Sequence, residues 1–146
     1  METDLMKLYS TRILALAADI PRLGRLEAPM GTARARSPQC GSSVGVDVDV
    51  VGGRVTRFAQ DVKACALGQA AAATVGAEAP GKTLAELTAA RAALAAMLDG
   101  GAVPAAPWTG FEVLKAAAPF KNRHASILLA LDATIAAVAD ADSKAA

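Results

Sequence analysis

The segment between the chain's two cysteines, Cys40 and Cys65, constrains the fold most strongly because it has the pattern of a β-hairpin. From residue 44 to residue 50, valines alternate with glycine or aspartate, which is typical of a strand with one buried face. Gly52 and Gly53 follow this run, and glycine accepts the positive φ angles that tight hairpin turns require. The sequence therefore predicts a strand that ends in a two-residue turn.

The second strand of the hairpin is expected over about residues 54–63. Its apolar residues are not all in phase, since Val55 is offset from Phe58 and Val62, and a β-bulge would absorb the difference. When such a hairpin closes, the segments before and after it become neighbours. Two cysteines that are far apart in the sequence would then face each other.

The remaining sequence predicts helices and one more strand. Apolar residues recur at helical spacing, and a capping box at Thr83 and Glu86 marks one helix start. Helices are predicted over 5–19, 66–75, 84–98, 108–117 and 123–139, a short strand over 31–36, and a surface loop over 99–107. We expect an α+β fold in which a small antiparallel sheet of about three strands packs against several helices. One domain would cover 1–146, with frayed ends at 1–4 and 141–146.

Composition excludes several classes of protein. The chain has 146 residues and a net charge of +1, so nothing indicates a nucleic-acid partner or an acidic membrane surface. Residues 1–4 are acidic and no apolar segment follows, so no signal peptide is expected. The most apolar window, 126–138, contains Asp132 and is too short to cross a bilayer. We expect a cytoplasmic protein whose cysteines are thiols or metal ligands.

Cys40, Cys65 and His124 form the first candidate site. Cys40 is predicted in a loop after Pro38, Cys65 at the start of a helix, and His124, the only histidine, in the first turn of the last helix. Thiolate and imidazole are the usual ligands of zinc and of iron–sulfur clusters, and a helix N-terminus stabilises a thiolate. The chain has no CxxC motif. The alternative is that both cysteines are small buried apolar residues and that His124 is an ordinary helix residue.

A second candidate is the segment 76–83, which fits the phosphate-binding pattern GxxxxGK[ST]. Residues 127–132 also resemble the apolar run with an aspartate that holds magnesium in nucleotide-binding enzymes. A phosphate-binding loop of this kind must follow a buried parallel strand, whereas 66–75 predicts a helix. We therefore interpret the segment as a capped helix start.

Two groups of charged residues are interpreted as solvated surface. Asp47 and Asp49 alternate with the valines and are expected on the exposed face of their strand. A basic patch for an acidic partner is one interpretation of four arginines, but a solvated sheet edge is favoured; these are Arg34, Arg36, Arg54 and Arg57.

Several short motifs, taken in order, resemble the iron–sulfur cluster assembly scaffolds of the IscU, NifU N-terminal and SufU family. The matching segments are 8–9 with 21–26, 38–42, 64–66, 81–86 and 119–126. They are similar, in that order, to the family's Leu-Tyr with Pro-Arg-Asn-x-Gly, Asn-Pro-x-Cys-Gly-Asp, Gly-Cys, Gly-Lys-Ser/Thr-x-x-Glu and Pro-x-Arg/Lys-x-x-Cys-Ala-Thr. The resemblance covers residues 8–139 and implies a SufE/NifU-like fold.

The chain departs from the family pattern at two positions. The third family cysteine falls on His124, and the aspartate that follows Cys-Gly is Ser42. Residues 123–125 can instead be aligned with the His-Cys pair of the IscU branch, which leaves Ala125 in the place of that cysteine. Histidine in place of cysteine keeps metal binding but removes a thiol that can carry persulfide.

The resemblance implies a metal site of Cys40, Cys65 and His124 with an open fourth position. Ser42 and Lys121 would lie behind these ligands, and Lys121 would stabilise the anionic thiolates. Sulfur acceptance would then have to use Cys40 or Cys65.

The resemblance also implies a carrier rather than an enzyme. The protein would bind a transient [2Fe–2S] cluster, or an iron or zinc ion in its place, and pass the cluster to recipient apoproteins, with a cysteine desulfurase as the sulfur source. One alternative is a zinc-bound sulfur acceptor that serves the desulfurase. Another is a divergent member that binds no metal and acts as a structural or regulatory partner. Nucleotide binding is the alternative outside the family.

Overall fold

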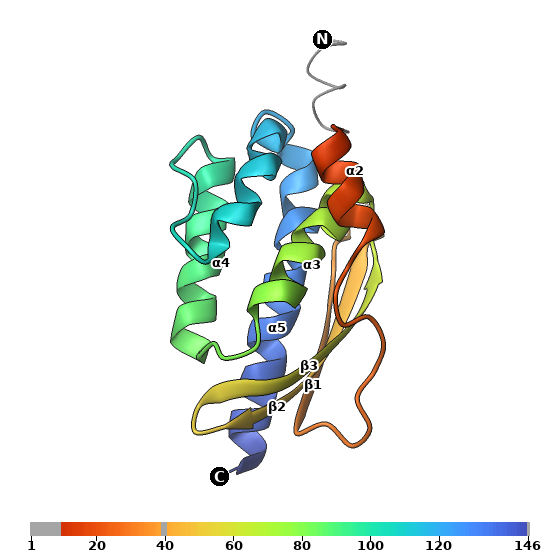
Figure 1. Cartoon of the computed structure of the whole chain (residues 1–146), viewed down its shortest axis with the longest axis vertical. Coiled ribbons are helices and arrows are strands. Elements are labelled where there is room, and N and C mark those ends of the chain that lie inside the picture. The colour runs from red at the N-terminus through yellow and green to blue at the C-terminus, as the bar shows by residue number, and fades with distance from the viewer. Residues whose placement is uncertain (1–9, 39–40, 146) are drawn as a thin grey trace.

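The structure, a computed structural model, describes residues 10–38 and 41–145 and has an α+β architecture (Figure 1). The elements in order are α2 (Thr11–Ala18), β1 (Gly31–Arg36), β2 (Ser43–Val51), β3 (Arg54–Lys63), α3 (Ala66–Glu78), α4 (Leu84–Leu98), the 3₁₀ helices η1 (Trp108–Ala117) and η2 (Lys121–Arg123), and α5 (His124–Ala145). The predicted fold class is confirmed. That residues 1–146 act as one domain stays a prediction.

The sheet has the strand order β1-β2-β3, and both pairs are antiparallel. Gly52 and Gly53 turn the chain between β2 and β3 with φ angles of 61° and 77°, which side chains other than glycine rarely adopt. The register shifts between Asp49 and Val50, so the predicted bulge is present. The turn glycines and the alternation of the strand residues therefore predicted the hairpin correctly.

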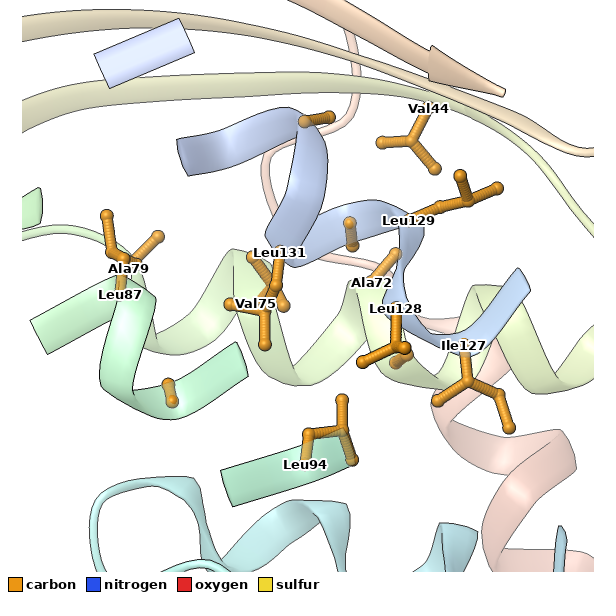
Figure 2. Close-up of a cluster of buried hydrophobic side chains, with 14 of the residues drawn as sticks. Val44, Ala72, Val75, Ala79, Leu87, Leu94, Ile127, Leu128, Leu129 and Leu131 are labelled. Atoms are coloured by element: carbon orange, nitrogen blue, oxygen red, sulfur yellow. The ribbon is translucent and has the colours of Figure 1, made fainter. Parts of the chain in front are cut away.

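One face of the sheet is covered by helices and carries the core. α5 packs directly on β1 and β2, α3 packs against α5 and β3, and α4 lies on the far side of α5 (Figure 1). In Figure 2, Leu129 of α5 points toward Val44 of β2, while Leu131 lies beside Val75 of α3. Each of these four side chains is at most 3% exposed. The valines of β2 thus supply the sheet side of the core.

Gly31 lets α5 approach the sheet very closely. A Cβ atom at this position would overlap the carbonyl oxygen of Ala137 and lie 2.7 Å from the backbone nitrogen of Ala141. Both contacts are with backbone atoms, which cannot move aside as a flexible side chain can. The first residue of β1 therefore has to be glycine for α5 to keep its position.

α5 is longer than expected. It continues to Ala145, and Ala141 is 1% exposed, whereas residues 141–146 were expected to be a frayed end. The helical segment Lys121–Ala145 is long and apolar enough to cross a membrane by length and composition alone. It is nevertheless the core helix of this fold, because 61% of its apolar window is buried inside the protein and Asp132 pairs with Arg91.

The other face of the sheet is not simply solvated. Asp47 is 1% exposed, which contradicts the expectation of a solvated face, because the segment before β1 covers it. Its carboxylate accepts hydrogen bonds from Arg25 (2.7 and 3.1 Å), from the backbone N–H of Leu26 (3.0 Å) and from the Thr32 hydroxyl (2.7 Å). Burial alone would raise the pKa of Asp47, but these hydrogen bonds outweigh it and hold the pKa below its ordinary value.

The arginines considered as a basic patch are mostly neutralised by carboxylates. Arg34 reaches across β2 to Asp61 of β3 (2.6 Å), and it can do so because Gly45, which lies between them in the register, has no side chain. Arg57 pairs with Asp49, and Arg54 pairs with Glu86. Among the described residues only Arg36 of this group makes no ion pair, so a basic patch built on all four is wrong.

Gly31→Ala is expected to lower the free energy of unfolding by about 1–3 kcal/mol, because the added methyl group overlaps the backbone of α5. Denaturant titration of the purified variant measures the change. Arg36→Ala is the matched control, since Arg36 is an exposed position on the same strand. A Gly31→Ala protein as stable as the wild type would contradict the proposed close approach.

Asp47→Asn is expected to lower stability at pH 7 by about 2 kcal/mol, because it removes charge-assisted hydrogen bonds at a buried position. The pKa of Asp47 is lower in the folded state than in the unfolded state, so the stabilisation is complete above the unfolded pKa. It is lost as the pH falls below about 4 and through the folded pKa.

Urea denaturation from pH 7 down to pH 2 should therefore show the wild-type and Asp47→Asn curves converging in acid. Asp142→Asn, at an exposed position of α5, serves as the control. A gap between wild type and Asp47→Asn that stays constant over this range would contradict the assignment.

Candidate functional site

Three segments that are distant in the sequence meet around the thiol of Cys65. The Cys65 Sγ atom lies 3.5 Å from the Ser126 Oγ atom, and the Ser126 hydroxyl donates to the Ser42 Oγ atom over 3.2 Å. These contacts join the end of β3, the first turns of α5 and the loop between β1 and β2. Cys65 and Ser42 were expected in the site from the sequence, whereas Ser126 was not.

Cys65 has the position that the sequence predicts. It follows β3 and is the N-cap of α3, with an extended backbone (φ −66°, ψ 171°). Its side chain makes no capping hydrogen bond to the helix and is a free, half-buried thiol. As the N-cap residue, Cys65 lies at the end of α3 where the unpaired backbone N–H groups favour negative charge.

The loop that carries Cys40 is closed at its two ends. The Ser37 N–H donates to the Ser42 carbonyl oxygen (2.8 Å), and the Gly41 N–H donates to the Ser37 carbonyl oxygen (3.0 Å). Cys40 itself lies outside the described residues. The chain on one side of it, at Ser42, nonetheless reaches Ser126 and so adjoins the Cys65 thiol.

His124 is the first residue of α5, and its ring binds the end of η1. The Nε2 atom lies 3.1 Å from the carbonyl oxygens of both Ala117 and Ala118. Both partners are acceptors, so Nε2 must carry the proton. In the neutral ring, Nδ1 is then the nitrogen with a lone pair available for a metal. Metal-binding histidines commonly donate their other N–H to a backbone carbonyl in this way.

The described residues alone do not form a complete metal site, since no group of three or more His, Cys, Asp or Glu side chains converges among them. Ser126, rather than His124, is the α5 residue in contact with Cys65. Two positions along an α-helix correspond to a rotation of roughly 200°, so these two side chains leave α5 in different directions. The site of Cys40, Cys65 and His124 stays a prediction.

Four positively charged residues lie near the site along the backbone. Arg36 and Lys63 lie opposite Ser43 on its two neighbouring strands, one residue from Ser42, while Lys121 and Arg123 precede α5. Within 10–38 and 41–145, none of these four residues makes an ion pair. Cations that are not neutralised favour an anion at this end of the molecule.

Gly68 allows α3 and α5 to meet at the site. A Cβ atom on Gly68 would lie 2.9 Å from the Ser126 hydroxyl oxygen, 3.2 Å from the Ser126 carbonyl oxygen and 2.8 Å from the Cβ of Ala64. An isolated glycine within a helical segment often marks such a close approach. Gly68 interrupts an alanine-rich helix, and this was the signal in the sequence that α3 has a close partner there.

Known proteins of solved structure identify the family, although no protein-family model and no curated protein sequence matches the chain. The crystal structure of a nitrogen-fixing NifU-like protein (N-terminal) from Brucella abortus superposes with a TM-score of 0.92. The two sequences are 36% identical over 96% of this chain and 98% of that chain. The chain belongs to the NifU-like N-terminal family, within the IscU/NifU/SufU group. The expected resemblance is confirmed.

Two further structures share the NifU-like fold. A hypothetical protein has a TM-score of 0.81 and 21% identity, covering 92% of this chain and 98% of that chain. A putative iron–sulfur cluster assembly scaffold protein for the SUF system from Fervidobacterium islandicum has a TM-score of 0.80 and 18% identity, covering 91% of this chain and 98% of that chain. At these identities the likeness concerns the fold alone.

The NifU-like fold also explains the phosphate-loop pattern at 76–83. The segment runs from the last turn of α3 to the N-cap of α4, where Thr83 and Glu86 form the predicted capping box. The Lys82 amine donates to the Glu78 carbonyl oxygen (2.8 Å) and lies 5.8 Å from the centre of the Trp108 ring. A helix in place of the required strand excludes a phosphate-binding loop here.

Gly68→Ala is expected to push α5 away from α3 at the site and to expose Cys65. Gly76→Ala is the matched control, because its Cβ would lie 2.6 Å from the Gln60 Nε2 atom and 2.7 Å from the Pro21 carbonyl oxygen, on the same helix but away from Cys65. Both variants should lose about 1–3 kcal/mol of stability. In a Cys40→Ser background, only Gly68→Ala should speed alkylation of Cys65 by iodoacetamide. Equal alkylation rates in the two variants would contradict this role of Gly68.

Proposed function

We propose that this NifU-like protein is an iron–sulfur cluster assembly scaffold that holds a cluster as cargo and hands it on. The main support is the convergence at Cys65 of the loop that carries Cys40 and of the start of α5, where His124 lies. Strong similarity over the whole chain to a NifU-like N-terminal protein supports the same function. The cargo is a substrate of the protein, so no turnover chemistry is required of its residues.

The proposed ligands are the Cys40 and Cys65 sulfurs and the Nδ1 atom of His124. The thiol of Cys65 fits such a role because it is free and only half buried. His124 fits because the carbonyl oxygens of Ala117 and Ala118 hold its Nε2 proton and leave Nδ1 for a metal. Solvent or a partner's side chain would complete the coordination, and an open position suits cargo that has to leave.

The surroundings of the site favour anionic sulfur. A [2Fe–2S] cluster with thiolate ligands carries net negative charge, and both the α3 N-terminus and the cations placed near this end of the molecule would favour it. Lys121 is one of these cations; it is exposed and would act through the field rather than by contact. A cysteine desulfurase and recipient apoproteins are the proposed partners, in the cytoplasm.

Zinc in place of the cluster is the second candidate. Thiolate and imidazole ligands suit zinc as well as iron, and in that case the protein would accept sulfur from a cysteine desulfurase through Cys40 or Cys65. A family member that binds no metal and acts as a structural or regulatory partner is the third.

Anaerobic reconstitution of the purified protein with iron and sulfide should give the visible absorption of a [2Fe–2S] cluster. Cys40→Ser, Cys65→Ser and His124→Ala should each abolish it, while Ser143→Ala, at an exposed serine of α5, should not. Mixing the loaded protein with an apo-ferredoxin should transfer the absorption. Elemental analysis after anaerobic purification separates iron from zinc. A folded protein that takes up neither metal, with thiols inert to alkylation, would contradict the proposal and favour the structural role.

A further inference from the structure

The Cys65 thiol is hydrogen-bonded to two serine hydroxyl groups in series, those of Ser126 and Ser42. A cysteine does not need such neighbours in order to bind a metal. Ser126 is 1% exposed and Ser42 is 4% exposed, so neither hydroxyl is a loose surface contact. The Cys65 Sγ atom lies 3.5 Å from the Ser126 Oγ atom, which in turn lies 3.2 Å from the Ser42 Oγ atom. Burying a hydroxyl group without a hydrogen bond costs free energy, so these contacts are part of what makes the burial of the two serines tolerable.

We infer that Ser126 is a positioning residue that donates a hydrogen bond to the Cys65 sulfur when this sulfur binds metal, with Ser42 fixing the Ser126 hydroxyl from behind. The inference rests on the proposed function, since it assumes that Cys65 is a metal ligand. It extends that function, because residues that do not bind the metal themselves would set how strongly the Cys65 sulfur binds it.

A count of protons shows how the chain can serve both states of Cys65. In the free thiol, the sulfur carries a proton and can donate to Ser126, while Ser126 donates to Ser42. A metal-bound sulfur carries no proton and can only accept. Rotation of two hydroxyl groups then reverses the chain, so that Ser42 donates to Ser126 and Ser126 donates to the sulfur.

The identity of residue 42 matters for this reversal. A serine hydroxyl both donates and accepts, whereas an ionised carboxylate only accepts. An aspartate at position 42 would therefore retain the Ser126 proton and could not pass one toward the sulfur. Ser42, which departs from the family pattern, is the residue type that the reversal needs.

The packing holds the Ser126 hydroxyl in place beside Cys65. Gly68 contacts Ser126 so closely that there is no room for a side chain, since a Cβ atom on Gly68 would lie 2.9 Å from the Ser126 hydroxyl oxygen. The neighbouring residue Ile127 is 0% exposed, so α5 cannot turn away at this point without opening the core. A preorganised donor of this kind stabilises the deprotonated sulfur that a metal requires, while it also withdraws electron density from it. Such partners outside the ligand set commonly change metal affinity by 10–100-fold.

Cobalt(II) is the probe for the metal-bound state, because thiolate-to-cobalt charge-transfer absorption reports both binding and the electron density on the sulfur. In the full-length protein under anaerobic conditions, Ser126→Ala is expected to weaken Co²⁺ binding by about tenfold and to shift the charge-transfer band to lower energy. Ser126→Thr keeps the hydroxyl and should restore the band position. Ser42→Ala leaves Ser126 in place and should show a smaller change in the same direction, which keeps the test available if Ser126→Thr does not fold.

A metal-free measurement tests the hydrogen bond by itself. In a Cys40→Ser background Cys65 is the only thiol, so infrared absorption shows a single S–H stretching band. Removal of its acceptor in Ser126→Ala should shift this band to higher frequency, whereas Ser143→Ala should leave it unchanged. Circular dichroism checks that each variant is folded.

The outcomes separate this inference from the proposed function. A wild-type protein without any thiolate-to-cobalt band would refute the proposed function. A band that is present in wild type and unchanged in energy and affinity in Ser126→Ala would refute the role of Ser126 alone. An unchanged S–H band in Ser126→Ala would refute the hydrogen bond itself.

Discussion

The close contact between α5 and its neighbours is the constraint on which the rest of the structure depends. α5 packs against one face of the sheet and beside α3. At each contact a glycine avoids a steric clash that any larger side chain would cause: Gly31 lies against Ala137, and Gly68 lies against Ser126. Dispersion attraction falls off steeply with distance, so small residues that let two elements approach closely increase the attraction between them. The same contact that closes the core also brings the start of α5 to Cys65. Fold and site therefore share one packing requirement.

The outer face of the sheet is stabilised differently, by paired charges rather than apolar burial. Asp47 is buried there together with hydrogen bonds from Arg25, Leu26 and Thr32, all from the segment before β2. A buried carboxylate without these partners would be strongly unfavourable, so the segment and the sheet need each other. At the end where Cys65 lies, by contrast, Arg36, Lys63, Lys121 and Arg123 make no ion pair among the described residues.

The parts of the fold that could be predicted from the sequence are those with a local cause. The alternation of valines, the two glycines of the turn and the capping box at Thr83 each act through neighbouring residues, and each appears as expected. A helix was also expected over 108–117, and the spacing of three between its buried residues Trp108, Phe111 and Leu114 suits the 3₁₀ helix that they form.

What the sequence did not reveal depends on contacts between distant segments. Asp47 has the alternation of a solvated residue, and only the covering segment makes it a buried one. No sequence pattern marks Ser126 as a site residue, and only the packing of α5 against α3 brings it into contact with Cys65. The direction of the His124 ring depends on two carbonyl oxygens at the end of η1, which no motif marks. Candidate ligands can be recognised from residue type, whereas the groups that orient them require the tertiary structure.

The two departures from the family pattern are best understood together. Replacement of a carboxylate by Ser42 and of a thiol by His124 each removes negative charge from the surroundings of the proposed metal site, and the cations at this end that make no ion pair among the described residues add positive charge. A less negative site holds an anionic cluster more firmly by simple electrostatics, which by itself would oppose its release. Hydroxyl groups offer a way to balance this effect, because a rotated hydroxyl can withdraw its proton from the sulfur without a change of net charge. A scaffold that has to bind and then surrender its cargo can thus regulate the sulfur through the direction of one hydrogen bond, while the surrounding charges stay constant.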